Sequence, residues 1–238
     1  MYPFLFGGIN TMYLIFSLPA LLFGFWAQAK VKNTFKKYSK IRTYTGASGG
    51  QVARHILDEN GLQDVRVEST TGFLSDNYDP RSRTLRLSQD VYQSNSLAAA
   101  GVAAHEAGHA LQHQAHYGPL QVRSLMVPTV MIGSWLGPII FMLGLFMSSA
   151  TGDTIAWIGI IVFGLTALFA IVTLPVELDA TKRAKIWLVS SGSLVESELP
   201  GAAAVLDAAA WTYVAAAIQA VTTIMYYAFL LLGRPRRQ

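Results

Sequence analysis

Four long apolar stretches divide the chain. A helix that crosses a bilayer needs about 20 consecutive, mostly apolar residues, because it rises about 1.5 Å per residue. The stretches Tyr2–Ala29, Leu125–Met147, Thr154–Pro175 and Ala208–Leu232 reach this length. We therefore predict four transmembrane helices, of which the second and third form a hairpin around the short turn Ser148–Asp153.

The polar part of the chain begins with a segment that has helical periodicity. Val52, Ile56 and Leu57 form an apolar stripe of the kind that one face of a helix presents. Ser48 is a suitable N-cap and Gly61 a suitable end. The pattern predicts a short helix between these two residues.

Extended segments follow this helix. Asp64–Thr70 alternates as a strand does, and Gly72–Ser88 contains two short extended stretches around the turn Asp76–Ser82. We expect a small antiparallel sheet. An alanine-rich segment without proline then predicts a second helix from about Asn95 through His116.

Composition supports the membrane prediction. Hydrophobic residues make up 52% of the 238 residues and charged residues 13%, whereas soluble domains average about 25% charged residues. The net charge is +4, but the basic residues lie at segment ends and form no stripe with aromatic side chains, so we expect no nucleic-acid partner. The chain has no cysteine, which excludes disulfides, thiolate zinc sites and cysteine nucleophiles.

The charge distribution also predicts an orientation. Lys30–Arg42 holds six lysine and arginine residues, and such clusters favour the cytoplasmic side. No basic residue precedes the first apolar stretch, so an uncleaved anchor with its N-terminus outside is favoured over a signal peptide cleaved after Ala27–Ala29. The basic residues Lys182, Arg183 and Lys185 fall on the cytoplasmic side as well.

The C-terminal tail disagrees with this orientation. After four crossings Gly233–Gln238, with three arginines, would lie outside. Either the last apolar segment does not cross fully, or the charge of this tail is overridden.

A histidine cluster is the main candidate for chemistry. The segment "HEAGHALQHQAH", His105–His116, holds four of the five histidines of the chain. His105 and His109 are one helical turn apart and can reach one ion. Together with Glu106 they match H-E-x-x-H, which supplies two zinc ligands and a glutamate that activates water. We predict one catalytic Zn²⁺ with Glu106 as general base.

The later histidines fit a ligand role less well. A metzincin would need glycine at Gln112 and histidine at Ala115. On a continuous helix His116 lies about 10 Å along the axis from His109, which is too far to share the ion. We expect His113 and His116 on a solvated or headgroup-facing helix face, with a substrate-contacting role for His113 as the alternative.

A third ligand must come from elsewhere, because hydrolytic zinc sites have three protein ligands, often two histidines and a glutamate. Glu177 and Asp179 lie where the third apolar segment meets the cytoplasmic side, and a carboxylate there is costly unless it has a partner. We favour Glu177, with Asp179 as the alternative ligand. An ordinary interfacial ion pair with Lys182 or Arg183 is the remaining interpretation.

Several motifs carry a resemblance to a known family. The chain resembles the YugP-like family of bacterial membrane zinc metallopeptidases along nearly its whole length, including the order of the four apolar segments. The motifs are "SGGQVARHILDENGL", "LSDNYDPRSRTLRLS", "VAAHEAGHALQHQ" and "LPVELDATKRA". The resemblance implies zinc bound by His105 and His109, Glu106 as catalytic base, and Glu177 at the position of the family's later glutamate.

A more distant resemblance adds one departure. HtpX-like and CAAX-prenyl-protease enzymes pair H-E-x-x-H with E-x-x-x-D. Here Thr181 stands at the position of that aspartate. The carboxylate expected to orient a histidine is therefore absent from this place, and Asp179 is the candidate to replace it.

Together these features predict a mainly α membrane protein, with four transmembrane helices and a small zincin-like α+β domain that carries the H-E-x-x-H helix. The expected parts are an anchor (1–29), the metallopeptidase region (30–124), a transmembrane hairpin (125–175), a cytoplasmic segment with the third ligand (176–207) and a C-terminal transmembrane helix with a basic tail (208–238).

The expected function is zinc-dependent endopeptidase activity in a multi-pass protein of the cell membrane, with the site on the cytoplasmic side. The expected partners are the lipid bilayer and a peptide or protein substrate, membrane proteins included. His113, Arg183 and Tyr78 are candidates to stabilise the oxyanion. The alternatives are a non-enzymatic scaffold or chaperone that retains zinc, an intramembrane site-2-type protease, and a haem protein.

Overall fold

The computed structural model describes residues 11–72, 75–147 and 149–233. The chain divides into two compact units, and each boundary falls inside a long helix. The first unit is Met1–Trp26, Val122–Thr173 and Thr212–Gln238, and the second unit is Ala27–Gln121 and Leu174–Trp211.

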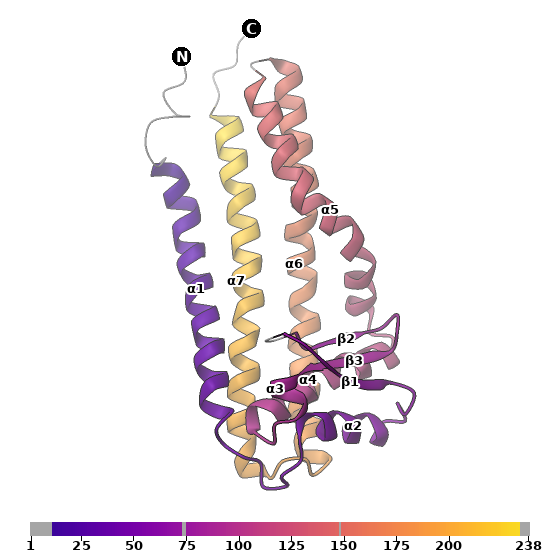
Figure 1. The fold of residues 1–238 in the computed structure, drawn as a ribbon. Coiled ribbons are helices and arrows are strands. Elements are labelled where there is room, and N and C mark those ends of the chain that lie inside the picture. Colours follow the sequence, from indigo (N-terminus) through magenta and orange to yellow (C-terminus); the bar gives the residue numbers. More distant parts are fainter. Residues whose placement is uncertain (1–10, 73–74, 148, 234–238) are drawn as a thin grey trace. The chain divides into compact units, whose positions relative to one another are not determined.

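Four long helices account for most of the chain (Figure 1): α1 (Thr11–Tyr38), α5 (Gly118–Phe146), α6 (Ala150–Ser190) and α7 (Leu199–Leu232). All four are long and apolar enough to cross a membrane, which confirms the four predicted apolar helices. α6 is longer than predicted, because the helix continues past Pro175 to Ser190. Residues 2–10 of the first predicted segment, Ser148 of the turn and residues 234–238 of the basic tail lie outside the described part.

In the first unit the helices contact one another through aromatic rings and small residues. The rings of Phe141 in α5 and Tyr227 in α7 stack with centroids 4.2 Å apart. A Cβ added to Gly159 in α6 would collide with the backbone of Phe141. Small residues allow such close approach of membrane helices, so α5 and α6 pack as the predicted hairpin.

The second unit contains a three-stranded sheet of β1 (Arg66–Thr70), β2 (Asn77–Asp79) and β3 (Thr84–Ser88) in the order β1-β3-β2. β2 and β3 are antiparallel, but β1 and β3 are parallel. The prediction of a wholly antiparallel sheet is therefore wrong. The most apolar strand, β3, takes the central position, where Leu85 and Leu87 are fully buried.

Short helices complete the second unit. α2 (Gly49–Glu59) begins with a capping box, in which Ser48 N–H donates to Gln51 Oε1 over 2.8 Å and Gln51 N–H donates to Ser48 Oγ over 3.3 Å. Gly61 follows with φ +72°. The predicted start and end of this helix are thus confirmed. α3 (Gln89–Tyr92) is one turn long and leads to α4 (Leu97–Gln114), which packs against α2 and the sheet.

α4 ends before the predicted residue. His116 adopts a left-handed conformation with φ 50°, and Tyr117 N–H donates to Gln112 O over 3.0 Å. This backbone closure satisfies a carbonyl at the helix end without glycine. The expectation that the helix continues through His116 is wrong, because the chain turns here and begins α5 at Gly118.

Candidate metal centre

α4 presents the two motif histidines side by side. Ser96 caps the helix by accepting a hydrogen bond from Ala99 N–H over 3.2 Å, and the alanines that follow are good helix formers. The ring centroids of His105 and His109 lie 4.8 Å apart, as their four-residue spacing predicts. His109 is buried and His105 is half-buried.

α6 brings a carboxylate to these rings. A Cβ added to Gly108 would lie 2.8 Å from Ala180 O, so the two helices approach closely at this point. Glu177 Oε2 lies 3.0 Å from His105 Nε2 and 3.6 Å from His109 Nε2. The glutamate is 2% exposed, so it takes up its position inside the unit and not at the surface.

These three side chains form a group that could hold a metal ion, with their ligand atoms within 4.8 Å of one another. Two histidine nitrogens and a carboxylate oxygen are a donor set of hydrolytic zinc sites. In a tetrahedral zinc site two ligand atoms are about 3.4 Å apart, given bond lengths of about 2.1 Å. The distances from Glu177 to the histidines are close to this value, so the residues fit zinc.

The second nitrogen of each histidine also has a partner. His109 Nδ1 lies 2.9 Å from Gln112 Oε1, and His105 Nδ1 lies 3.3 Å from Thr181 Oγ1. Histidines that bind a metal are generally held in this way at the other ring nitrogen. Sequence reasoning noted Gln112 and Thr181 only as departures from other families and missed both contacts.

Asp179 does not join the histidines. Its Oδ2 accepts hydrogen bonds from Gln112 Nε2 over 2.9 Å and from Arg183 Nε over 2.6 Å. The ion pair with Arg183 is the interpretation that sequence analysis had kept open for one acid of this segment. Of the two candidate carboxylates, the structure brings Glu177 alone into the described cluster.

Glu106 lies beside this cluster and is 8% exposed. Burial raises the pKa of Glu106 to about 7; the nearby negative charges of Glu177 and Asp76 also raise it, and the charge of His105 lowers it. The backbone N–H of Tyr78 donates a hydrogen bond to the carboxylate. Near neutral pH this group can therefore both accept and release a proton.

Tyr78 and His113 form a pair next to Glu106. Tyr78 Oη lies 2.8 Å from His113 Nδ1. Burial, together with the positive charges of Arg83 and His116, lowers the pKa of His113. His113 is thus half-buried and paired, not on the solvated face that we expected, whereas His116 is exposed as expected.

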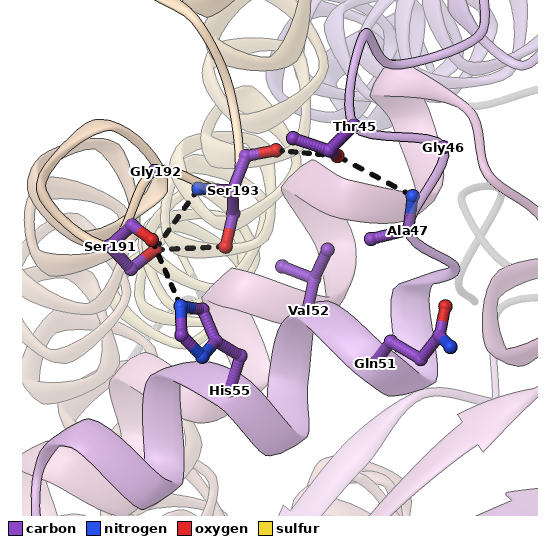
Figure 2. A pocket seen from close by; sticks show the side chains of 9 residues that line it. All are labelled: Thr45, Gly46, Ala47, Gln51, Val52, His55, Ser191, Gly192 and Ser193. Atoms are coloured by element: carbon purple, nitrogen blue, oxygen red, sulfur yellow. Dashed lines mark hydrogen bonds between the residues drawn. The ribbon is translucent and has the colours of Figure 1, made fainter.

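A shallow hollow of about 520 Å³ lies elsewhere in the second unit, between α2 and the turn after α6. Figure 2 shows the His55 ring pointing toward Ser191, and His55 Nε2 lies 2.9 Å from Ser191 O. None of the residues of the metal cluster lines this hollow. Its lining consists of Thr45, Gly46, Ala47, Gln51, Val52, His55, Ser191, Gly192 and Ser193.

Comparisons with known proteins identify the family of the chain. Residues 13–232 match a family model described as "Putative neutral zinc metallopeptidase". The chain is also 43% identical over 222 residues to a Bacillus subtilis (strain 168) protein named "Putative membrane protease YugP", which covers 93% of this chain and 97% of that protein. No solved structure matches the chain. Because the family model spans nearly the whole sequence, the chain belongs to this zinc metallopeptidase family.

Proposed function

We propose that the protein is a membrane zinc endopeptidase whose zinc is held by His105, His109 and Glu177. The observation that carries this proposal is the convergence of these three donors beside the buried carboxylate of Glu106. The family assignment and the four apolar helices support a metallopeptidase in a membrane.

Bound zinc would supply a Lewis acid that lowers the pKa of a coordinated water and polarises the scissile carbonyl. Glu106 accepts a proton from the attacking water and returns it to the leaving amine nitrogen, so that one peptide bond breaks and one water is consumed. The burial that raises the pKa of Glu106 favours its role as the group that takes up and returns this proton. The Tyr78 N–H holds the carboxylate in place during both proton transfers.

The oxyanion needs a donor from the chain as well. Tyr78 contacts Glu106 through its backbone and His113 through its hydroxyl, which supports these two side chains as candidates. Arg183, whose Nε donates to Asp179, remains the third candidate. We assign the oxyanion contact to the Tyr78–His113 pair.

The charge pattern supports a cytoplasmic location of the site. The six basic residues in Lys30–Arg42 belong to the same unit as the metal cluster, and basic clusters next to apolar segments favour the cytoplasm. Substrates would then be peptides or proteins that reach this face of the membrane, membrane proteins included.

Glu106→Gln tests the function. The amide cannot take the proton but has nearly the same size as the carboxylate. The variant should therefore retain about one zinc per chain, and its cleavage rate should fall about 10²–10⁴-fold. The measurements are metal analysis of both purified proteins and quantitative proteomics of membranes from cells that express each one. A Glu106→Gln protein that cleaves as well as the wild type would contradict the proposal. It would favour a scaffold or chaperone with a retained zinc site.

A further inference from the structure

One buried amide joins the two helices of the metal cluster. Gln112 is fully buried. Its amide nitrogen uses both of its hydrogens, and its amide oxygen has one hydrogen-bond partner. Its Oε1 lies 2.9 Å from His109 Nδ1. Its Nε2 donates to Val176 O over 2.7 Å and to Asp179 Oδ2 over 2.9 Å.

These contacts fix the orientation of the amide. A backbone carbonyl can only accept a hydrogen bond, and Asp179 Oδ2 accepts a second one from Arg183 Nε over 2.6 Å. Both groups therefore require the amide nitrogen of Gln112, which leaves the amide oxygen facing His109. Since that oxygen can only accept, Nδ1 of His109 must carry the hydrogen.

The tautomer of His109 follows directly. With the hydrogen on Nδ1, the lone pair of His109 lies on Nε2, the nitrogen that is 3.6 Å from Glu177 Oε2. This is the form of imidazole that binds a metal ion. His105 has no such constraint, because its Nδ1 partner is the Thr181 hydroxyl, which can either donate or accept.

Gln112 also acts on the other helix. Val176, whose carbonyl it binds, directly precedes Glu177 in α6. The same side chain thus holds one ligand on α4 in its metal-binding tautomer and restrains the backbone next to the ligand on α6. Supporting contacts of this kind raise metal affinity, because they orient the ligands before the ion binds.

We infer that Gln112 is a positioning residue for the metal centre, which sets the tautomer of His109 and aligns Glu177 through Val176 and Asp179. The inference rests on the proposed zinc site. It assigns Gln112 a role in metal affinity that neither H-E-x-x-H nor the third ligand supplies.

The first test measures zinc affinity of the full chain in detergent by competition with a chelator, so that no catalytic activity is needed. Gln112→Met keeps the length of the side chain but removes all three hydrogen bonds, and it should weaken zinc binding about 10–100-fold. Gln114→Met is the matched control, because Gln114 is exposed on the same helix and bonds only Asn60 O within the described contacts. The control should change the affinity by less than about twofold.

A second pair of variants separates positioning from packing. Gln112→Glu can accept from His109 but sets a second carboxylate against Asp179, so its zinc affinity should fall at least as far as that of Gln112→Met. Adding Asp179→Asn restores a donor toward residue 112 and the original charge but no donor to Val176 O, so the double variant should recover part of the lost affinity. If Gln112→Met does not fold, the comparison of Gln112→Glu with the double variant still tests whether Gln112 positions the metal centre.

Two outcomes overturn the inference alone: Gln112→Met binding zinc as tightly as the wild type, or the double variant binding no more tightly than Gln112→Glu. A wild-type protein that binds no zinc would overturn the proposed function and this inference together.

Discussion

The two units of the molecule place polar and apolar side chains in opposite ways. In the first unit large apolar side chains are exposed, such as Leu125 (79%), Trp135 (76%) and Met131 (70%). Among the described residues, the buried polar and charged side chains belong to the second unit, with the exception of Thr173. The first unit is thus built for an apolar solvent, whereas the second has a folded core that encloses charged groups.

This difference locates the chemistry. Burying a carboxylate is costly unless it is paired or bonded, and an exposed apolar surface of this extent is stable in lipid and not in water. The second unit offsets the cost of burying Glu177 with two histidine contacts. The first unit has no comparable group among its described residues, so we expect it to hold the protein in the membrane and the second unit to carry the reaction.

The largest effect should come from removing the buried acid of the second unit. Glu177→Ala deletes one of three proposed ligands, so the zinc affinity should fall by more than about 100-fold. Leu178→Ala changes the next residue, which is 52% exposed, and should bind zinc normally. Metal analysis after dialysis against a weak chelator measures both. If Glu177→Ala retains zinc, Asp179→Ala becomes the decisive variant.

The metal centre shows how far the sequence could predict this site. His105, Glu106 and His109 were predictable, because their relative positions depend only on the geometry of one helix. The choice between Glu177 and Asp179 was not, because it depends on how α6 is rotated against α4, where Gly108 meets Ala180. The contacts of Gln112 with Val176 and of Thr181 with His105 were hidden for the same reason, since each joins residues more than 60 positions apart in the sequence.

In the fold, too, the locally determined features were predictable from the sequence and the features that depend on distant contacts were not. The four apolar helices and the capping of α2 by Ser48 are local patterns, and the structure confirms them. The parallel pairing of β1 with β3 depends on which strand takes the centre of the sheet, and an alternating pattern does not contain that information. The end of α4 before His116 depends on a left-handed residue that is not glycine, and such an end has no sequence signature.

Replacing an exposed aromatic residue by arginine should show whether lipid or water surrounds each unit. Trp135 in α5 and Tyr44 in the second unit are similarly exposed, 76% and 84%. Trp135→Arg should cost about 2.5–3.5 kcal/mol of insertion free energy, the value for a charge near the centre of a membrane helix, and Tyr44→Arg should cost little. A glycosylation-tag insertion assay of α5 measures the first, and thermal unfolding of the purified protein measures the second. Equal tolerance of the two changes would mean that α5 does not face lipid at Trp135.

The smallest effect concerns the close approach of helices inside the second unit. A Cβ on Gly108 would lie 2.8 Å from the Ala180 carbonyl oxygen, whereas a Cβ on Gly164 in the first unit would have no neighbour within 4 Å. Gly108→Ala must shift α4 against α6 and should lower the free energy of unfolding by about 1–3 kcal/mol. Gly164→Ala should leave it unchanged or raise it by up to about 1 kcal/mol, because alanine is the better helix former. Thermal unfolding in detergent with and without zinc measures both variants.

Since the shift would also move Glu177 relative to His105 and His109, Gly108→Ala should lose part of its stabilisation by zinc, and Gly164→Ala should keep all of it. The reverse order of the two variants would mean that the α4–α6 contact does not position the metal centre.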